Sequence, residues 1–205
     1  SAGQSFGAFS VPGMNLMLHG EANDYVGKGM TGGQIVIAPP QEVGFAAHQN
    51  TIIGNTVLYG ATGGQLFAAG RAGERFAVRN SGALAVVEGV GAHACEYMTG
   101  GLVVVLGETG ANFGAGMSAG VAYVLDPRGV FPRRCNDELV DLQRLEDPTE
   151  IEALYTLISW HRKKTNSWRA AQVLAEWSQT QRVFWRVSAR GYVADTRDLL
   201  AQVRG

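Results

Sequence analysis

Residues 27 to 32 (GKGMTG) reproduce the GxGxxG pattern that binds the pyrophosphate of a dinucleotide. That fingerprint needs a strand before it and a helix after it, because the helix N-terminus supplies the N–H groups and the dipole that bind phosphate. Here the pattern leads into the apolar run QIVI, which stops at Pro39 and Pro40. We therefore interpret these glycines as turn residues and predict no nucleotide site.

Groups suited to acid–base or metal chemistry are scattered along the chain. The histidines are His19, His48, His93 and His161. The carboxylates from which a catalytic pair could form are Glu74, Glu88 and Glu96. No HxH or HExxH spacing occurs, so each histidine is interpreted as structural or solvated. The glutamates lack a second polar partner and are interpreted as solvated. The sequence predicts no catalytic, cofactor-binding or metal-binding residue.

Two cysteines occur, Cys95 and Cys135, outside any CxxC motif. We interpret Cys95 as a small buried hydrophobe. Arg133 and Arg134 could lower the pKa of Cys135, although a plain linker cysteine is the favoured interpretation. Two distant cysteines cannot ligate an iron–sulfur cluster. This cysteine usage favours a reducing, cytoplasmic location.

The charge balance argues against several classes of partner. A net charge of −1 and a pI near 6.4 give no electrostatic case for nucleic acid or an anionic membrane. No apolar run reaches the length of about 18 residues that a membrane span needs. One basic cluster, Arg71, Arg75 and Arg79, is compatible with a salt-bridged outer face or with contact to a partner, and both alternatives stay open.

Glycine recurs at a nearly fixed interval, and this repeat indicates the architecture. The repeated positions are Gly13, Gly33, Gly64, Gly82, Gly101 and Gly120. The spacing is close to 19 residues once an insertion from Pro39 to Asn50 is set aside. The second and fourth residues after each glycine from Gly33 onward are apolar, for example Leu84 and Val86, which predicts strands with one buried face. Such a repeat is typical of a parallel β-solenoid coil.

We therefore predict a mainly β fold, a right-handed parallel β-helix of about six to seven short coils with an α-helical C-terminal tail. The expected domains are a β-helix over residues 1–126, a linker over 127–144 and a helical extension over 145–205. The chain begins at Ser1 inside what resembles a repeat, so we expect it to be part of a longer polypeptide.

The tail has recognisable helix signals. Asp147 followed by Pro148 predicts a helix start, and this helix should end near Lys164. A second helix is expected from Ser167 to Gln179, with Trp168 among its buried residues. An extended segment over 183–187 and a last helix over 193–203 complete the prediction. The four tryptophans, Trp160, Trp168, Trp177 and Trp185, are expected to help pack the helices against the open end of the solenoid.

Several long stretches carry a resemblance to a known family: ANDYVGKGMTGGQIVI at 22–37, IIGNTVLYGATGGQLFAAGRAGERFAVRNSGA at 52–83 and CEYMTGG at 95–101. They closely resemble the GXGXG domain at the C-terminal end of glutamate synthase large subunits. CNDELVDL at 135–142 resembles the segment after the β-helix, so the resemblance covers roughly residues 1 to 165. FWRVSARGY at 184–192 is a looser match, with Ala189 where proline is expected.

The resemblance implies an enzyme that transfers ammonia from glutamine to 2-oxoglutarate and reduces the product to glutamate, a step of nitrogen assimilation. The family's FMN, 3Fe-4S cluster and N-terminal cysteine nucleophile belong to other domains. This chain would then be an inactive structural domain, holding the glutaminase and FMN-binding domains in register. Its implied partners are those two domains, with an NAD(P)H/FAD electron-donor subunit or ferredoxin as the source of electrons.

Two alternatives from other classes remain. A free-standing β-helix subunit, similar to one in formylmethanofuran dehydrogenase, would share the fold, although the RAGERFAVRNSGA and CNDELVDL matches speak against it. A β-helix enzyme similar to polysaccharide lyases would need acidic and basic residues gathered on one exposed face. The coils are instead rich in Gly, Ala and Val.

Overall fold

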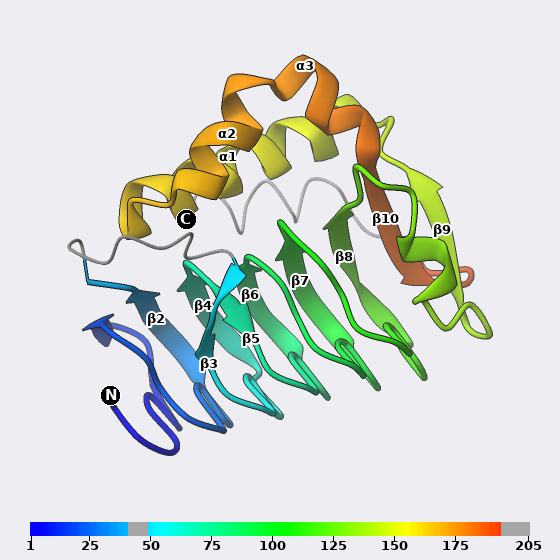
Figure 1. The fold of residues 1–205 in the computed structure, drawn as a ribbon. Coiled ribbons are helices and arrows are strands. Elements are labelled where there is room, and N and C mark those ends of the chain that lie inside the picture. Colours follow the sequence, from blue (N-terminus) through cyan, green and yellow to red (C-terminus); the bar gives the residue numbers. More distant parts are fainter. Residues whose placement is uncertain (41–48, 194–205) are drawn as a thin grey trace.

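The computed structural model describes residues 1–40 and 49–193, and the chain winds as a β-solenoid built around one long sheet (Figure 1). Its parallel strands are β1 (Asn15–His19), β2 (Thr31–Ala38), β4 (Gly63–Ala68), β6 (Ser81–Val87), β7 (Thr99–Val105) and β8 (Ala119–Leu125). The predicted β-helix is confirmed, with about five turns rather than six to seven, since six parallel strands enclose five turns. A second, two-stranded ladder pairs β3 (Thr51–Ile53) with β5 (Arg71–Ala72).

The register of the coils departs from the glycine repeat at two of the six glycines. In the first coil Asn15 pairs with Gln34, so Gly33 aligns with Met14 and not with Gly13. Gln65 pairs with Leu84, so Gly64 aligns with Ala83 and not with Gly82. Ala83 and Ala85 therefore face the solenoid interior, and the expected inward positions, Leu84 and Val86, point to the opposite side. This strand thus presents two alanines to the interior and two larger side chains to the helices.

Both faces of the sheet are buried, whereas the alternation of apolar residues had predicted one. The interior face includes Ile35, Leu66, Val103 and Ala122. The opposite face includes Phe67, Val104 and Tyr123, and it packs against Leu154, Leu157 and Ile158 of α1 (Pro148–Thr165). Helices α1 and α2 (Trp168–Ala175) run across the row of strands (Figure 1). Burial on two sides makes this sheet a central layer of the molecule.

The turns at one edge of the solenoid alternate between right-handed and left-handed backbone. In one coil the left-handed residues are Arg75, Ala77 and Arg79. The N–H of Arg75 and that of Arg79 donate to the following coil, at 2.9 and 3.0 Å, while the N–H of Ala77 donates to the preceding coil at 2.8 Å. The alternation thus satisfies backbone groups toward both neighbours, which offsets the strain of φ > 0 in non-glycine residues.

Helix α1 is confirmed, including its start. The Asp147 carboxylate accepts hydrogen bonds from the N–H groups of Thr149 (2.8 Å) and Glu150 (3.0 Å). The single helix expected from Ser167 to Gln179 is wrong, because the chain breaks at Glu176 into α2 and the short α3 (Trp177–Thr180).

The buried face of α2 also differs from the expectation. It consists of Ala170 and Val173, whereas Trp168 is 60% exposed. A small and a branched side chain allow α2 to approach the sheet closely, and an indole at the same place would hold the two apart. The last predicted helix, and most of the insertion at 39–50, lie outside the described residues.

A strand closes the C-terminal end of the solenoid. β10 (Phe184–Ala189) pairs antiparallel with β8, and β9 (Val140–Arg144) pairs antiparallel with β10. The extended segment over 183–187 is therefore confirmed. The idea that helices cover this end is wrong, because free strand N–H and C=O groups need the backbone partners that another strand supplies. Short 3₁₀ turns, η2 (Phe131–Arg133) and η3 (Gln181–Val183), lead into this region.

Candidate functional site

The GxGxxG segment forms a turn of the solenoid. Gly27 and Gly29 adopt left-handed backbone, and the chain continues directly into strand β2. A Cβ at Gly29 would lie 2.8 Å from the Phe9 ring, so glycine allows this ring to lie directly on the turn. The interpretation as turn glycines is consistent with this geometry.

The histidines and glutamates considered from the sequence do not gather into one site. His19 ends β1 in an exposed position, and His48 lies outside the described residues. His93 Nδ1 lies 2.6 Å from Glu96 Oε1, and exposed Glu74 pairs with Arg75 at 3.9 Å. These contacts are local to single coils.

The three arginines predicted as a basic cluster have separate partners. Arg71 lies 3.8 Å from the Glu108 carboxylate, and the Arg79 guanidinium lies 5.6 Å from the centre of the Tyr97 ring. Arg75 contacts Glu74, as described above. The three side chains therefore do not act as one charged patch.

Glu88 is buried, which corrects its interpretation as a solvated carboxylate. It is 2% exposed at the end of β6, and its Oε1 lies 2.9 Å from Nε2 of His161 on α1. The Ser167 hydroxyl donates to the same Oε1 atom and also caps α2 through the N–H of Ala170 at 2.9 Å. No motif or spacing pointed to this cluster, since 73 residues separate Glu88 from His161.

The Glu88 cluster contains the residue types of a hydrolytic triad but not its geometry. A catalytic serine donates to the histidine, whereas here Ser167 and His161 both contact the carboxylate. The His161 side chain is fully buried, so no substrate reaches it. The cluster joins α1 and α2 to the sheet.

Neither cysteine is suited to nucleophilic or metal chemistry. Burial raises the pKa of the Cys95 thiol well above its ordinary value. Burial also raises the pKa of Cys135 to about 12, with the Asp137 carboxylate adding to the effect. The idea that Arg133 and Arg134 lower this pKa is wrong, because burial dominates.

The chemistry of these thiols does not fit a 3Fe-4S cluster, which binds thiolates. Over residues 1–40 and 49–193, no three His, Cys, Asp or Glu side chains gather where they could hold a metal ion. In the same part of the chain, no helix combines the length and apolar character that crossing a membrane requires.

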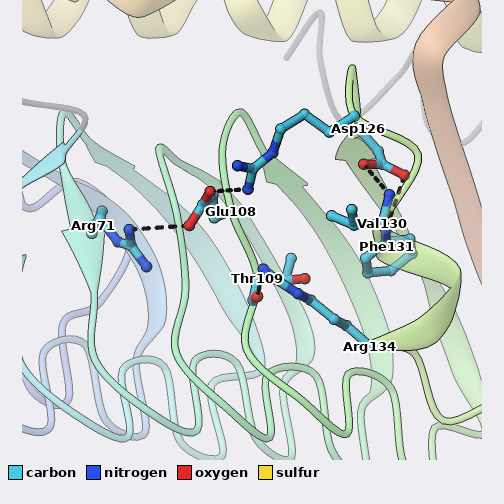
Figure 2. Close-up of polar contacts among 8 residues, drawn as sticks. Arg71, Glu108, Thr109, Asp126, Val130, Phe131 and Arg134 are labelled. Carbon is cyan, nitrogen blue, oxygen red and sulfur yellow. Dashed lines mark hydrogen bonds and ion pairs between the residues drawn. The ribbon is translucent and has the colours of Figure 1, made fainter.

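A hollow at the carboxyl ends of β7 and β8 gathers charged side chains from four separate segments. Its volume is about 170 Å³, and Leu125, Pro127, Val130 and Phe131 contribute apolar walls. Arg128, Arg134 and Arg169 line the same hollow, together with Glu108 and Asp126. We call this hollow the arginine pocket; most of its charged residues appear in Figure 2.

The two carboxylates of the arginine pocket already have partners. Glu108 accepts from Arg128 and faces Arg71 at 3.8 Å. The Asp126 carboxylate accepts from the N–H groups of Val130 and Phe131, each at 3.0 Å (Figure 2), and from Trp185 Nε1 at 3.1 Å. Asp126 therefore holds the chain between β8 and η2 in place.

Two arginines of the pocket contact only backbone oxygens among the interactions found in the described residues. Arg134 donates to the carbonyl of Thr109, and Arg169 Nε donates to that of Leu106 at 2.8 Å. Burial lowers the pKa of Arg169, and the Glu88 carboxylate opposes this shift. Sequence reasoning missed the pocket because its residues lie on loops and on α2, with no common motif or spacing.

Comparisons with known proteins connect the chain to one family over most of its length. A family model described as GXGXG motif matches residues 1–190. The chain is 56% identical over 187 residues to "Ferredoxin-dependent glutamate synthase 1, chloroplastic/mitochondrial" of Arabidopsis thaliana, covering 91% of this chain and 12% of that protein. It is 57% identical over 186 residues to "Ferredoxin-dependent glutamate synthase 2" of Synechocystis, with the same coverage.

The name of a fungal relative contains a different electron donor, NADH. "Glutamate synthase [NADH]" of Schizosaccharomyces pombe is 54% identical over 194 residues, which is 95% of this chain and 9% of that protein. The chain thus spans about an eighth or less of the length of these relatives.

Proposed function

Because the chain belongs to the GXGXG family and matches glutamate synthase large subunits, we propose that it is a non-catalytic domain that holds two catalytic domains of such an enzyme in register. The partners would be the glutaminase and the FMN-binding synthase domains. The observation that supports this most directly is the 56% identity over 91% of the chain to a glutamate synthase.

Rigidity is the physical basis of this role. Neighbouring parallel strands pair over most of their length, as in β6 with β7, where Ala85 pairs with Val103. The sheet packs on both faces, so bending it would break strand hydrogen bonds and disturb two cores at once. Fixed separation matters in a two-site enzyme, because a small misplacement of reacting groups can cost a large factor in rate.

The cofactors of the whole enzyme, FMN and a 3Fe-4S cluster, would be held outside this chain. Its two thiols, whose pKa values are raised, do not fit the cluster, so we assign no step of the reaction to them. The names of the relatives include ferredoxin and NADH. Either ferredoxin or an NAD(P)H-linked donor is therefore compatible with the proposal, and a cytoplasmic location stays a prediction.

A one-coil deletion in the intact enzyme tests the proposal. Removing residues 81–99 joins Asn80 to Gly100, the residue that pairs with Ser81 in the next coil, and shortens the solenoid by about 4.8 Å. We expect glutamine hydrolysis to persist while glutamate formed per glutamine hydrolysed falls. Arg133→Gln, an exposed substitution, is the control.

Full coupling in a correctly folded deletion variant, verified by circular dichroism, would contradict the proposed role. Equal loss of coupling in Arg133→Gln would contradict it as well, since that change leaves the length of the solenoid intact. The amount of glutamate formed per glutamine hydrolysed distinguishes a loss of coupling from a general loss of activity.

A further inference from the structure

The arginine pocket carries more positive charge than its own carboxylates balance. Arg71 and Arg128 share the Glu108 carboxylate. Asp126 is held by backbone and indole N–H groups, and Glu88 is the carboxylate that acts on Arg169. Three guanidinium groups thus line the pocket against two carboxylates.

Arg134 and Arg169 are the guanidinium groups with capacity left to bind an anion. Each has five N–H donors, and the contacts found use one donor of each for a carbonyl. The partial burial that lowers the pKa of Arg169 also removes water from it. A partly desolvated guanidinium binds a carboxylate through short, charge-assisted hydrogen bonds.

The walls and the volume of the pocket restrict the anion further. Val130 and Phe131 give it apolar sides, and its volume is about 170 Å³. An apolar cavity of about 150 Å³ accommodates a molecule of the size of benzene. A compact organic anion fits this description better than a strongly hydrated phosphate, which would gain nothing from the apolar walls.

We propose that the arginine pocket binds a small organic monocarboxylate. The carboxylate accepts hydrogen bonds from Arg134 and Arg169, and its carbon chain lies against Val130 and Phe131. One negative charge neutralises the excess of one guanidinium group. The site lies apart from any catalytic group of this chain, so it goes beyond the structural role proposed above and does not depend on it.

Titration of the isotopically labelled 205-residue chain with butyrate, followed by NMR, tests the proposal. Butyrate has the same number of non-hydrogen atoms as benzene, and butyramide is its neutral counterpart. We expect saturable binding of butyrate with shifts at Val130 and Phe131. Butyramide and inorganic phosphate should each bind about tenfold more weakly.

Two substitutions locate the binding site. Arg134→Gln and Arg169→Gln should each weaken butyrate binding about tenfold, whereas Arg133→Gln, which does not line the pocket, should leave it unchanged. If a glutamine variant does not fold, Arg134→Lys and the cavity-filling Val130→Phe provide the same test. Lysine should retain part of the affinity, and phenylalanine should abolish it.

Three outcomes would overturn the proposal: no saturable binding, equal binding of butyrate and phosphate, or equal losses in Arg134→Gln and Arg133→Gln. A further arm uses the intact enzyme and equilibrium dialysis with labelled butyrate. Binding to the 205-residue chain but not to the intact enzyme would also overturn the proposal, because the pocket would then be inaccessible to a free ligand in the enzyme.

Discussion

The two ends of the solenoid are finished in different ways. At the C-terminal end, β8 pairs with β10, and six of the seven β8 residues are buried. At the N-terminal end, β1 pairs only with β2 within the described residues, and Asn15, Met17 and His19 are exposed. The difference shows that strand hydrogen bonds close one end, while at the other end β1 has no second strand partner among the described residues.

The closed end also has a buried ion pair, whereas no ion pair is found at the open end among the described residues. Arg186 of β10 donates from Nε to buried Glu150 of α1 at 2.8 Å, and the Arg144 guanidinium lies 3.6 Å from the centre of the Trp185 ring. The first coil instead exposes large apolar side chains, with Phe9 67% and Met17 52% exposed. Such exposed apolar groups are typical of a surface that meets another protein surface.

The largest effect is expected from a charge inside the closed end. Val187 is fully buried opposite Ala122, so Val187→Asp places an unpaired carboxylate between β8 and the core. We expect a loss of about 4 kcal/mol or more in the free energy of unfolding, measured by urea denaturation. Met17→Asp at the open end should change it by about 0.5 kcal/mol or less. Similar losses in the two variants would contradict the contrast between the ends.

Thiols at the two ends should react with an alkylating reagent at widely different rates. Because the pKa of Cys135 is raised to about 12, its thiolate is scarce at pH 8, and its reaction with iodoacetamide should accelerate as pH rises toward that value. A reference thiol from Asn15→Cys, on exposed β1, should react about a thousandfold faster at pH 8. Mass spectrometry of the alkylated peptides measures both rates, which should converge in urea. Equal rates in the folded protein would contradict the raised pKa of Cys135.

The buried ion pair of the closed end should contribute more than an exposed pair nearby. Glu150→Gln leaves Arg186, whose side chain is 13% exposed, without its charged partner, and should cost about 3 kcal/mol. Asp141→Asn breaks the exposed pair with Arg190, at 3.4 Å, and should cost less than about 1 kcal/mol. Thermal unfolding of both variants checks the order. A reversed order would mean that the Glu150 contact does not stabilise the cap.

The smallest effect on stability is expected at the open end, where association should change instead. Met17→Lys places a charge on the exposed strand β1, which discourages edge-to-edge pairing. We expect light scattering at high protein concentration to show self-association of the unmodified chain and less of it in the variant. The free energy of unfolding should move by about 0.5 kcal/mol or less. An unmodified chain that stays monomeric would indicate that β1 is not an adhesive edge.

Sequence reasoning succeeded where the chain repeats itself. The recurring glycines and apolar runs predicted parallel strands at about 19-residue intervals, and the structure pairs Leu66 with Ala85 and Ala85 with Val103 at that separation or one residue less. The start of α1 was also predicted, because Asp147 and Pro148 act on the adjacent backbone. These features depend on local interactions or on a repeated unit.

Sequence reasoning failed where distant segments compete for the same surface. Leu84 faces the helices because it packs in one cluster with side chains of α1. A shift of the register by one residue is enough to exchange the side chains on the two faces of a strand. In α2, Ala170 and Val173 are the buried residues because these side chains fit against the sheet. Periodicity describes which residues share a face but does not say which partner that face will meet.

The sequence by itself determined the repeat, the β-helical fold class, the first helix and the resemblance to glutamate synthases. Only the tertiary structure decided that β10 closes the C-terminal end, that Glu88 meets His161, and that Arg134 and Arg169 line one pocket. The physical reason is the distance along the chain over which each interaction acts. Turn chemistry and strand alternation act over a few residues, whereas burial and the balance of charge depend on segments that folding brings together.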